Sequence, residues 1–492
     1  MQHKFKLATL SSLLCANAFA TPVYQPPGPN LTYGSSSNNQ SIMSSIANPA
    51  AAAAVLRKED SQYRFGIISL GGGYEIGNVN DLFNQIDNSK NTITTPIDTN
   101  AMATLYLNAC GTTTTCSNPS QFASDIATFI NTSAAVTTLN NTVLPALQRD
   151  GNASVFFGGH VPFTPFVIAR KGWGGSIVFD ANVSAVANMS FIEDPLFINP
   201  TTAGNIATNY QAAVNSCNCP NPTTYTVPTI PNDSTMLIKG AVVAELGLGY
   251  SRSIFTREAS VLAEGEQTPG ALSASELKAG ELTAGVRLKY YQVKLANDAE
   301  SFKESSTGAQ STLKKTLTYT TNSGVGLDVG TLWTSKHYRA GAWVNNLNSP
   351  SFKYKAIDTT GYTNPTIIAQ LTTDRTYTMK PQLQLEGAVY TQSQNWVVNA
   401  GLDANAVKDP VGRDFQWMTL SGAYATSSWW IPGARVGYRS NLAGSKLSYV
   451  TAGLTIFKAL SLDIAYGLDK LTYEGKSIPR SAMINLGLQM TF

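Results

Sequence analysis

The last twelve residues of the chain, Ser481–Phe492, read SAMINLGLQMTF and alternate in polarity without a break. Every second position is apolar: Ala482, Ile484, Leu486, Leu488, Met490 and Phe492. The positions between them are mostly small or polar: Met483, Asn485, Gly487, Gln489 and Thr491. Successive side chains of a strand point to opposite faces, so this pattern predicts a strand with one apolar and one polar face. A tilted strand of this length crosses a bilayer.

The same alternation recurs upstream. It is regular in Leu460–Leu468 and Trp396–Ala406, and 415–426, 433–440 and 446–457 are further candidates. Other strands are expected near 62–72, 154–169, 175–188, 240–254, 280–294, 312–333, 337–347 and 376–390. The total is about fourteen, and bacterial single-chain barrels have even strand numbers. We therefore predict an all-β membrane protein, an antiparallel outer-membrane β-barrel of about 14 strands.

A soluble β-sandwich or a β-helix would alternate in the same way. The strand length and the terminal aromatic residue favour the barrel. Phe492, preceded by apolar residues at alternate positions, resembles the signal that the outer-membrane assembly machinery reads. Outer-membrane lipid and this machinery are therefore the expected partners. Aromatic residues at the ends of the apolar faces suit an interfacial girdle: Tyr390, Trp396, Tyr424, Trp429 and Trp430.

The composition excludes several classes of protein. Charged residues make up 13% of the chain, against about 25% in an average soluble domain. Mean hydropathy is −0.07, yet no stretch approaches the ~18–20 apolar residues of a membrane-spanning helix. The net charge is only +3. These values argue against a nucleic-acid-binding surface, a disordered acidic chain and a helical membrane protein, so no nucleic-acid partner is expected.

The first twenty residues have the features of a secretory signal. Lys4 and Lys6 form the basic start, 7–15 is the apolar core, and Ala18-Phe19-Ala20 is a small-x-small cleavage site. A lipoprotein signal lipidated at Cys15 is the alternative, but Leu14 is large for that processing. We expect removal of residues 1–20 and a place in the bacterial outer membrane.

Not all of the mature chain fits a barrel wall. Residues 21–60 are rich in Pro, Ser and Asn and then in Ala, and we expect them to form a small N-terminal plug. The barrel would span 61–492, with insertions at 73–153 and 191–236. The first is expected to be partly helical, because 80–88 and 121–149 show helical spacing of apolar residues. The second is rich in Asn, Pro and Thr and is expected to be a loop.

Four cysteines follow the signal, in two close pairs: Cys110 with Cys116, and Cys217 with Cys219. Disulfides are the default for such residues in an oxidising compartment. A bond between Cys110 and Cys116 closes easily, whereas a direct Cys-x-Cys bridge is strained. Disulfides between the two insertions are therefore also possible, and the sequence does not decide between these two connectivities. No metal site is expected, because only His160 and His337 could join the cysteines.

Charged residues on the strands' polar faces are the candidate functional groups of the lumen. The alternation points eight of them inward: Glu245, Arg287, Asp328, Glu386, Asp403, Arg435, Arg439 and Asp463. Arg or Lys on the lipid face would cost about 2–4 kcal/mol at mid-membrane, which enforces this direction. They could orient a solute or hold the plug, or they could be cross-strand ion pairs that brace the barrel.

Four segments carry a resemblance to a known family: Ala47-Asn48-Pro49-Ala50, the D-x-G strand 326–333, the N-L-x-x-P-x-F stretch 345–352, and 380–387. Together they resemble the outer-membrane family of FadL-like barrels, and especially its conjugal-transfer TraF-like branch. The resemblance implies a fourteen-stranded barrel with an N-terminal segment in its lumen. For the transporting members it also implies a passage for hydrophobic molecules that opens sideways into the membrane.

Asn48 and Pro49 could anchor the plug in the lumen, or Pro49 could merely interrupt the alanine run. No enzyme, cofactor or catalytic residue is expected, since neither His160 nor His337 adjoins a nucleophile motif such as G-x-S-x-G. We expect a barrel associated with transfer or with passage of hydrophobic solutes, whose partner is a hydrophobic small molecule or a conjugation apparatus. A docking barrel that uses its long loops is the alternative, and an outer-membrane hydrolase is a remote one.

Overall fold

The computed structural model describes residues 31–32, 41–55, 63–94, 96–170, 173–222, 225, 230, 232–258, 274–302, 317–373, 375–391, 393, 395–424 and 429–491. The expected signal peptide, 1–20, and the expected assembly signal, Phe492, lie outside these residues, as does part of the expected plug.

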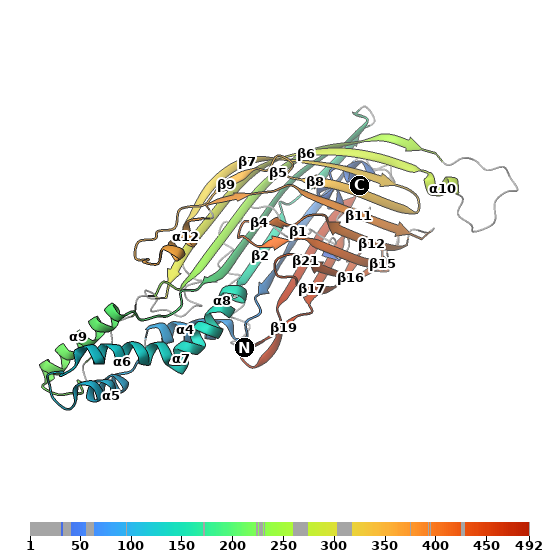
Figure 1. Cartoon of the computed structure of the whole chain (residues 1–492). Coiled ribbons are helices and arrows are strands. Elements are labelled where there is room, and N and C mark those ends of the chain that lie inside the picture. The colour runs from blue at the N-terminus through green and yellow to red at the C-terminus, as the bar shows by residue number, and fades with distance from the viewer. Residues whose placement is uncertain are drawn as a thin grey trace.

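The strands form a closed antiparallel barrel with fourteen positions in its wall (Figure 1). β2 (Ala153–His160) and β3 (Phe166–Arg170) share one position, because both pair with β1 and with β4. The other positions hold β1 (Tyr63–Ile76), β4 (Gly175–Ile192), β5 (Thr235–Arg257), β6 (Gly280–Ser301), β7 (Tyr319–Thr334), β8 (Tyr338–Asn345), β11 (Gln382–Tyr390), β12 (Trp396–Asp403), β15 (Trp417–Tyr424), β16 (Gly433–Asn441), β17 (Ser448–Ile456), β18 (Leu460–Gly467) and β21 (Ser481–Thr491). β21 closes the barrel on β1, so the predicted fold is confirmed.

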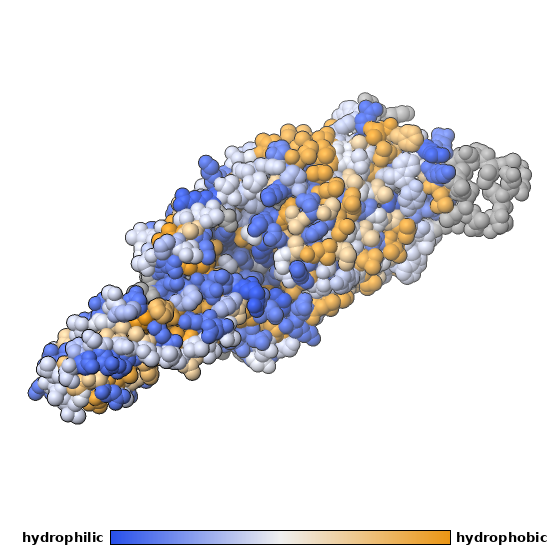
Figure 2. Space-filling view, viewed as in Figure 1, coloured by the Kyte–Doolittle hydropathy of each residue, from blue (hydrophilic) through white to orange (hydrophobic). Residues whose placement is uncertain are grey.

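Side chains alternate across the wall as the sequence predicts. On β18, Leu462, Ile464 and Tyr466 are exposed, whereas Asp463 and Ala465 are buried. Exposed apolar residues of the other strands continue this surface, and Figure 2 shows them as orange patches on the barrel. In lipid this face replaces the core of a soluble protein, while the strand ladder satisfies the backbone.

The expected aromatic girdle is present in part. Trp396 and Tyr424 pack in a tilted arrangement with ring centroids 5.1 Å apart, and Trp430 is 84% exposed. Tyr390 corrects the expectation, because it packs against the buried Ala388 and Val397 on the inner face. It shares the parity of Ala388, so the alternation places both inside.

The two ends of the barrel differ. Since strand direction alternates, the connections 77–152, 193–234, 346–381 and 404–416 all lie at the end opposite Thr491, which we term the loop end. The other end, the turn end, has mostly short connections, such as 335–337 and 457–459. Three small hairpins belong to loop-end connections: β9 (Ser351–Lys353) with β10 (Thr376–Thr378), β13 (Val407–Lys408) with β14 (Asp414–Phe415), and β19 (Lys470–Tyr473) with β20 (Lys476–Pro479). Helix α12 (Pro365–Thr373) is also at the loop end, and α10 (Ala274–Lys278) is at the turn end.

Two insertions at the loop end fold together into one helical lobe (Figure 1). The first supplies α4 (Leu82–Thr94), α5 (Thr99–Cys110), α6 (Pro119–Thr132), α7 (Ala134–Thr138), a π-helical turn (Leu139–Val143) and α8 (Leu144–Asp150). The second, expected to be a loop, instead contains α9 (Pro200–Cys217). Asn199 caps this helix by accepting a hydrogen bond from the Thr202 amide at 2.8 Å. Proline in its first turn suits a helix start.

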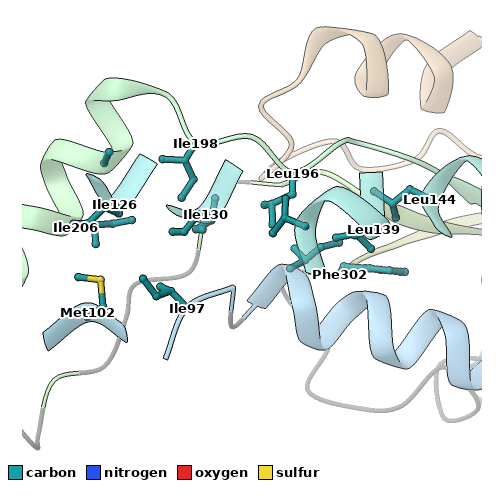
Figure 3. Close-up of a cluster of buried hydrophobic side chains, with 14 of the residues drawn as sticks. Ile97, Met102, Ile126, Ile130, Leu139, Leu144, Leu196, Ile198, Ile206 and Phe302 are labelled. Carbon is teal, nitrogen blue, oxygen red and sulfur yellow. The ribbon is translucent and has the colours of Figure 1, made fainter. Parts of the chain in front are cut away.

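The lobe has its own hydrophobic core. Ile126 of α6 and Ile206 of α9 belong to one buried cluster and lie side by side in Figure 3. Tyr106, Phe122 and Tyr210 form a second contact, with ring centroids 5.3–5.7 Å apart. Burial raises the pKa of Tyr210 to about 12, so its hydroxyl stays protonated at neutral pH.

The disulfides connect Cys110 with Cys116 and Cys217 with Cys219, which settles the connectivity in favour of local pairs. They follow the C-terminal ends of α5 and α9. Gln211 of α9 connects this helix with the segment that holds Cys116. Its side chain accepts a hydrogen bond from the Cys116 amide at 3.0 Å and donates one to the Thr114 carbonyl at 2.6 Å. Among the described residues no helix is long and apolar enough to cross a membrane.

Phe122→Ala should unfold the lobe while the barrel stays intact, because removing a buried phenylalanine costs about 3–5 kcal/mol. Limited proteolysis should cleave 77–152 much faster, whereas migration on a gel should remain heat-modifiable. Phe129→Ala is the control, since Phe129 lies on the same helix but is exposed. Equal protease sensitivity of the two variants would contradict this account of the lobe.

Candidate functional site in the barrel lumen

The segment 41–55, the longer of the two described parts of the expected plug, packs against the inside of the barrel wall. It contains α2 (Ser44–Ala47) and α3 (Ala51–Val55), joined by Asn48-Pro49-Ala50. Its residues pack against the inner faces of β4, β5, β6 and β7. The Asn48 side chain accepts from the Ala50 amide at 2.9 Å and thereby shapes the turn between the two helices.

Two glycines form the seat of this turn. Gly285 of β6 and Gly330 of β7 are direct cross-strand partners. A methyl group on Gly285 would clash with the Pro49 backbone, and one on Gly330 with the Asn48 side chain. Asn48 also donates to the Thr331 carbonyl at 3.1 Å, and Thr283 donates to the Ala50 carbonyl at 3.1 Å. The two glycines therefore leave a groove that fits this turn of the plug.

Three of the sequence-predicted lumen residues meet beside the plug: Glu245, Arg287 and Asp328. Arg287 Nη2 lies 2.6 Å from Glu245 Oε1, and Arg287 Nε lies 3.4 Å from Asp328 Oδ2. Lys289, which the sequence analysis did not select, lies 2.7 Å from Asp328 Oδ1. Two acids thus face two bases, and the buried charges neutralise each other.

Arg287 also contacts the plug directly. Its Nη1 donates to the Ile46 carbonyl at 2.6 Å, at the C-terminal end of α2. A cation is favourable there, because the last carbonyls of a helix have no partner within the helix. The same guanidinium therefore joins the plug to the ion pairs of the wall.

Arg435 and Asp463 form a separate pair. Arg435 Nη2 and Nε lie 2.5 Å and 2.8 Å from the two Asp463 oxygens. Gly453 lies between them on β17, opposite both residues in the strand register. A methyl group on Gly453 would clash with both side chains. The glycine therefore lets Arg435 and Asp463 meet above β17, the strand that lies between theirs.

The other three predicted residues have their own partners and do not join these clusters. Glu386 accepts from the Asn399 side chain at 2.8 Å. Asp403 accepts from Gln384, Gln382 and the Trp417 amide at 2.7, 3.0 and 2.8 Å. Arg439 lies over the Trp417 ring, 4.2 Å from its centroid, and donates to the Leu31 carbonyl at 3.3 Å.

The wall is interrupted at 161–165, between β2 and β3. Phe163 of this segment is 65% exposed, and Val161 beside it is also exposed. Backbone bonds still bridge the gap: Val161 N–H donates to Ala181 O at 2.9 Å, and Gly66 N–H donates to Pro165 O at 2.9 Å. We term this segment the wall break; it is closed by hydrogen bonds to both neighbouring strands.

The plug covers the inner side of this region with apolar side chains. Ile42, Met43 and Ile46 form a buried cluster with Val167 of β3 and Val178 of β4. Sequence reasoning missed these wall residues, because nothing in the sequence shows which strands the plug touches. Among the described residues no group of three or more His, Cys, Asp or Glu side chains could hold a metal ion.

Gly285→Ala should loosen the plug, because the new methyl group meets the Pro49 backbone, and overpacking of this kind costs about 1–3 kcal/mol. In an Ala53→Cys background, thiol labelling should become several-fold faster, since Ala53 is buried in the seated plug. Gly422→Ala is the matched control, as a methyl group there meets nothing within 4 Å. Unchanged labelling in Gly285→Ala would contradict the seating of the plug on this glycine.

Asp463→Asn should destabilise the barrel by about 3–5 kcal/mol, because it leaves Arg435 buried without its counter-charge. The double variant Arg435→Met/Asp463→Asn should recover much of this loss, as it removes both charges. Urea unfolding followed by tryptophan fluorescence measures both. A double variant that is less stable than Asp463→Asn would contradict a simple ion pair.

Comparison with known proteins places this geometry in context. The sequence model of a family described as "F plasmid transfer operon, TraF, protein" matches residues 45–403. No curated protein sequence matches the chain.

Similar solved structures include the monoaromatic hydrocarbon channel TodX in a deltaS2S3 mutant form, with 12% identity, coverage of 94% of this chain and 99% of that one, and a TM-score of 0.38. The toluene transporter TodX of P. putida follows, with 10% identity, 91% and 94% coverage and a TM-score of 0.28. The transport unit of the autotransporter AIDA-I from Escherichia coli has 8% identity, 89% and 92% coverage and a TM-score of 0.27. Since the family match covers residues 45–403, which is more than half of the chain, the chain belongs to the family of F plasmid transfer operon TraF proteins.

Proposed function

We propose that this protein is an outer-membrane barrel that passes hydrophobic solutes between its lumen and the membrane through the wall break. The observation that supports this most directly is the apolar cluster of Ile42, Met43 and Ile46 with Val167 and Val178. Barrel interiors are ordinarily polar. An apolar surface beside an interruption of the wall suits a solute that leaves water for lipid.

The proposed orientation follows from the connections. Outer-membrane barrels have short periplasmic turns and longer extracellular loops, so the loop end and its helical lobe would face outward. The outward apolar surface of the strands would contact outer-membrane lipid, and assembly would require the machinery of that membrane. Heat-modifiable migration of the outer-membrane fraction tests this placement.

The plug would act as the movable part. It is held by directional contacts that can be broken one at a time, such as the bond from Arg287 to the Ile46 carbonyl. Its withdrawal from Val167 and Val178 would expose apolar wall next to the break. The hydrogen bonds that join the break to Gly66, Ile67 and Ala181 would then be the remaining barrier.

A plug tied to the wall should stop uptake. The Ala53 amide donates to Ser251 Oγ at 2.9 Å, so Ala53→Cys/Ser251→Cys places two thiols close together across this contact. Uptake of radiolabelled oleate by a Gram-negative host without its own uptake barrel should fall at least about tenfold when this pair is oxidised, and reductant should restore it. The wild-type protein with and without reductant is the control, because its native disulfides are also reducible. Equal uptake in the oxidised and reduced states would contradict the proposal.

A second candidate function is docking of a conjugation apparatus on the helical lobe. The lobe supports it, because two separate insertions build one folded unit with its own core at the proposed outer end. The family's link with plasmid transfer suggests the partner. Phe122→Ala would then lower plasmid transfer while leaving oleate uptake intact.

A further inference from the structure

Three inner-wall residues beside the break, Ser69, His160 and Asp180, lie on adjacent strands. Ser69 of β1 is the direct cross-strand partner of His160 on β2. His160 in turn faces β4, where Asn182 is its direct partner and Asp180 lies two residues away. All three are buried, with exposures of 2%, 6% and 0%. The strand register brings Ser69 and His160 together, although they are 91 positions apart in the sequence.

His160 and Asp180 form a defined pair. His160 Nδ1 lies 3.0 Å from Asp180 Oδ1, and Asn182 Nδ2 donates to Asp180 Oδ2 at 2.7 Å. A buried carboxylate on Nδ1 keeps the proton on that nitrogen and leaves Nε2 as the basic one. Asp180 also lies near Arg287, since a Cβ atom added to Gly247 would be 3.7 Å from Asp180 Cβ and 3.5 Å from Arg287 Cδ. Arg287 therefore brings a positive charge close to the carboxylate that holds the imidazole.

Ser69 is on the side of His160 away from Asp180. Direct cross-strand partners on one face have Cβ atoms about 4.5–5.5 Å apart, so a rotation of the Ser69 side chain brings its Oγ within reach of the imidazole held by Asp180. Such contacts are often longer before substrate binds. The neighbouring inner positions are glycines, namely Gly71, Gly158 and Gly487, which leave room beside the hydroxyl.

We propose that Ser69, His160 and Asp180 form a nucleophile, base and orienting acid for hydrolysis of carboxylic esters with an apolar acyl chain. Ser69 Oγ attacks the ester carbonyl carbon while His160 Nε2 takes its proton. The alcohol leaves with that proton and the acyl group remains on Ser69. Water then attacks the acyl-serine with His160 as base, releasing the carboxylic acid and restoring Ser69.

The surroundings fit this chemistry. Asn182 Nδ2 donates to Asp180 Oδ2 and so holds the carboxylate that orients the imidazole. Asn182 Oδ1 is buried and has no hydrogen-bond partner in the described part of the chain, so one acceptor beside the pair is free. The wall break begins at the residue after His160, so an acyl chain can extend from the site toward lipid.

The test uses the folded, detergent-purified full chain and a fluorescent fluorophosphonate, which reacts only with activated serines. Wild type should be labelled, and mass spectrometry should place the probe on Ser69. Ser69→Ala should lose labelling completely. Ser184→Ala, another buried inner-wall serine on β4, should keep it. Hydrolysis of p-nitrophenyl octanoate should fall at least about 100-fold in Ser69→Ala and His160→Gln.

Asp180→Asn separates catalysis from mere packing, because it keeps the size of the side chain but not its charge. It should lower kcat about 100-fold or more with little change in KM, and raised pH should recover part of the loss. No labelling of heat-modifiable wild-type protein, or labelling that survives in Ser69→Ala, would overturn the proposal. The outcome does not depend on oleate uptake, so failure of this site and failure of the proposed passage are distinguishable.

Discussion

The pairing of backbone groups is the constraint on which the rest of this structure depends. In lipid, an unpaired amide or carbonyl costs several kcal/mol, so a sheet can cross the membrane only if it closes on itself. β21 closes the ladder on β1. Even the wall break obeys the rule, since Val161 and Gly66 bond across it. The strand can therefore be interrupted there without leaving a row of unpaired groups.

Closure creates an interior that side chains must fill, and glycine is the recurring solution to its crowding. At Gly285 and Gly330 the missing side chains make room for Asn48 and Pro49 of the plug. At Gly453 the missing side chain lets Arg435 of β16 reach over β17 to Asp463 of β18. In both places a tight contact exists because the wall residue beneath it has no Cβ atom.

Alternation carried most of the sequence prediction. It identified the strands, and it points Asp463 and Arg435 away from the lipid face, where a charge at mid-membrane is costly. Parity also explains why Tyr390 was wrongly assigned to the outer girdle. Tyr390 and Glu386 are four residues apart on β11, so their side chains share the inner face.

The alternation within one strand does not show the register between strands, that is, which residues of two neighbouring strands lie opposite each other. Lys289 and Asp180 escaped notice because their roles depend on which residue lies opposite them on another strand. The joining of the two insertions into one lobe is equally a long-range contact. Helix α9 was different, since its buried Ala203, Ile206, Tyr210 and Val214 have helical spacing that the surrounding Asn, Thr and Pro residues obscured.

The arrangement of charges explains how a plug can be both held and released. If the plug leaves, Arg287 loses its bond to the Ile46 carbonyl but keeps Glu245 and Asp328 as counter-charges. The loss is then one hydrogen bond to a charged group, worth about 1.5–3 kcal/mol, and not the larger cost of an uncompensated buried charge. A plug held by ion pairs of its own would leave charges behind on departure. Because the wall balances its charges without the plug, the proposed withdrawal would leave Arg287 with its counter-charges in place.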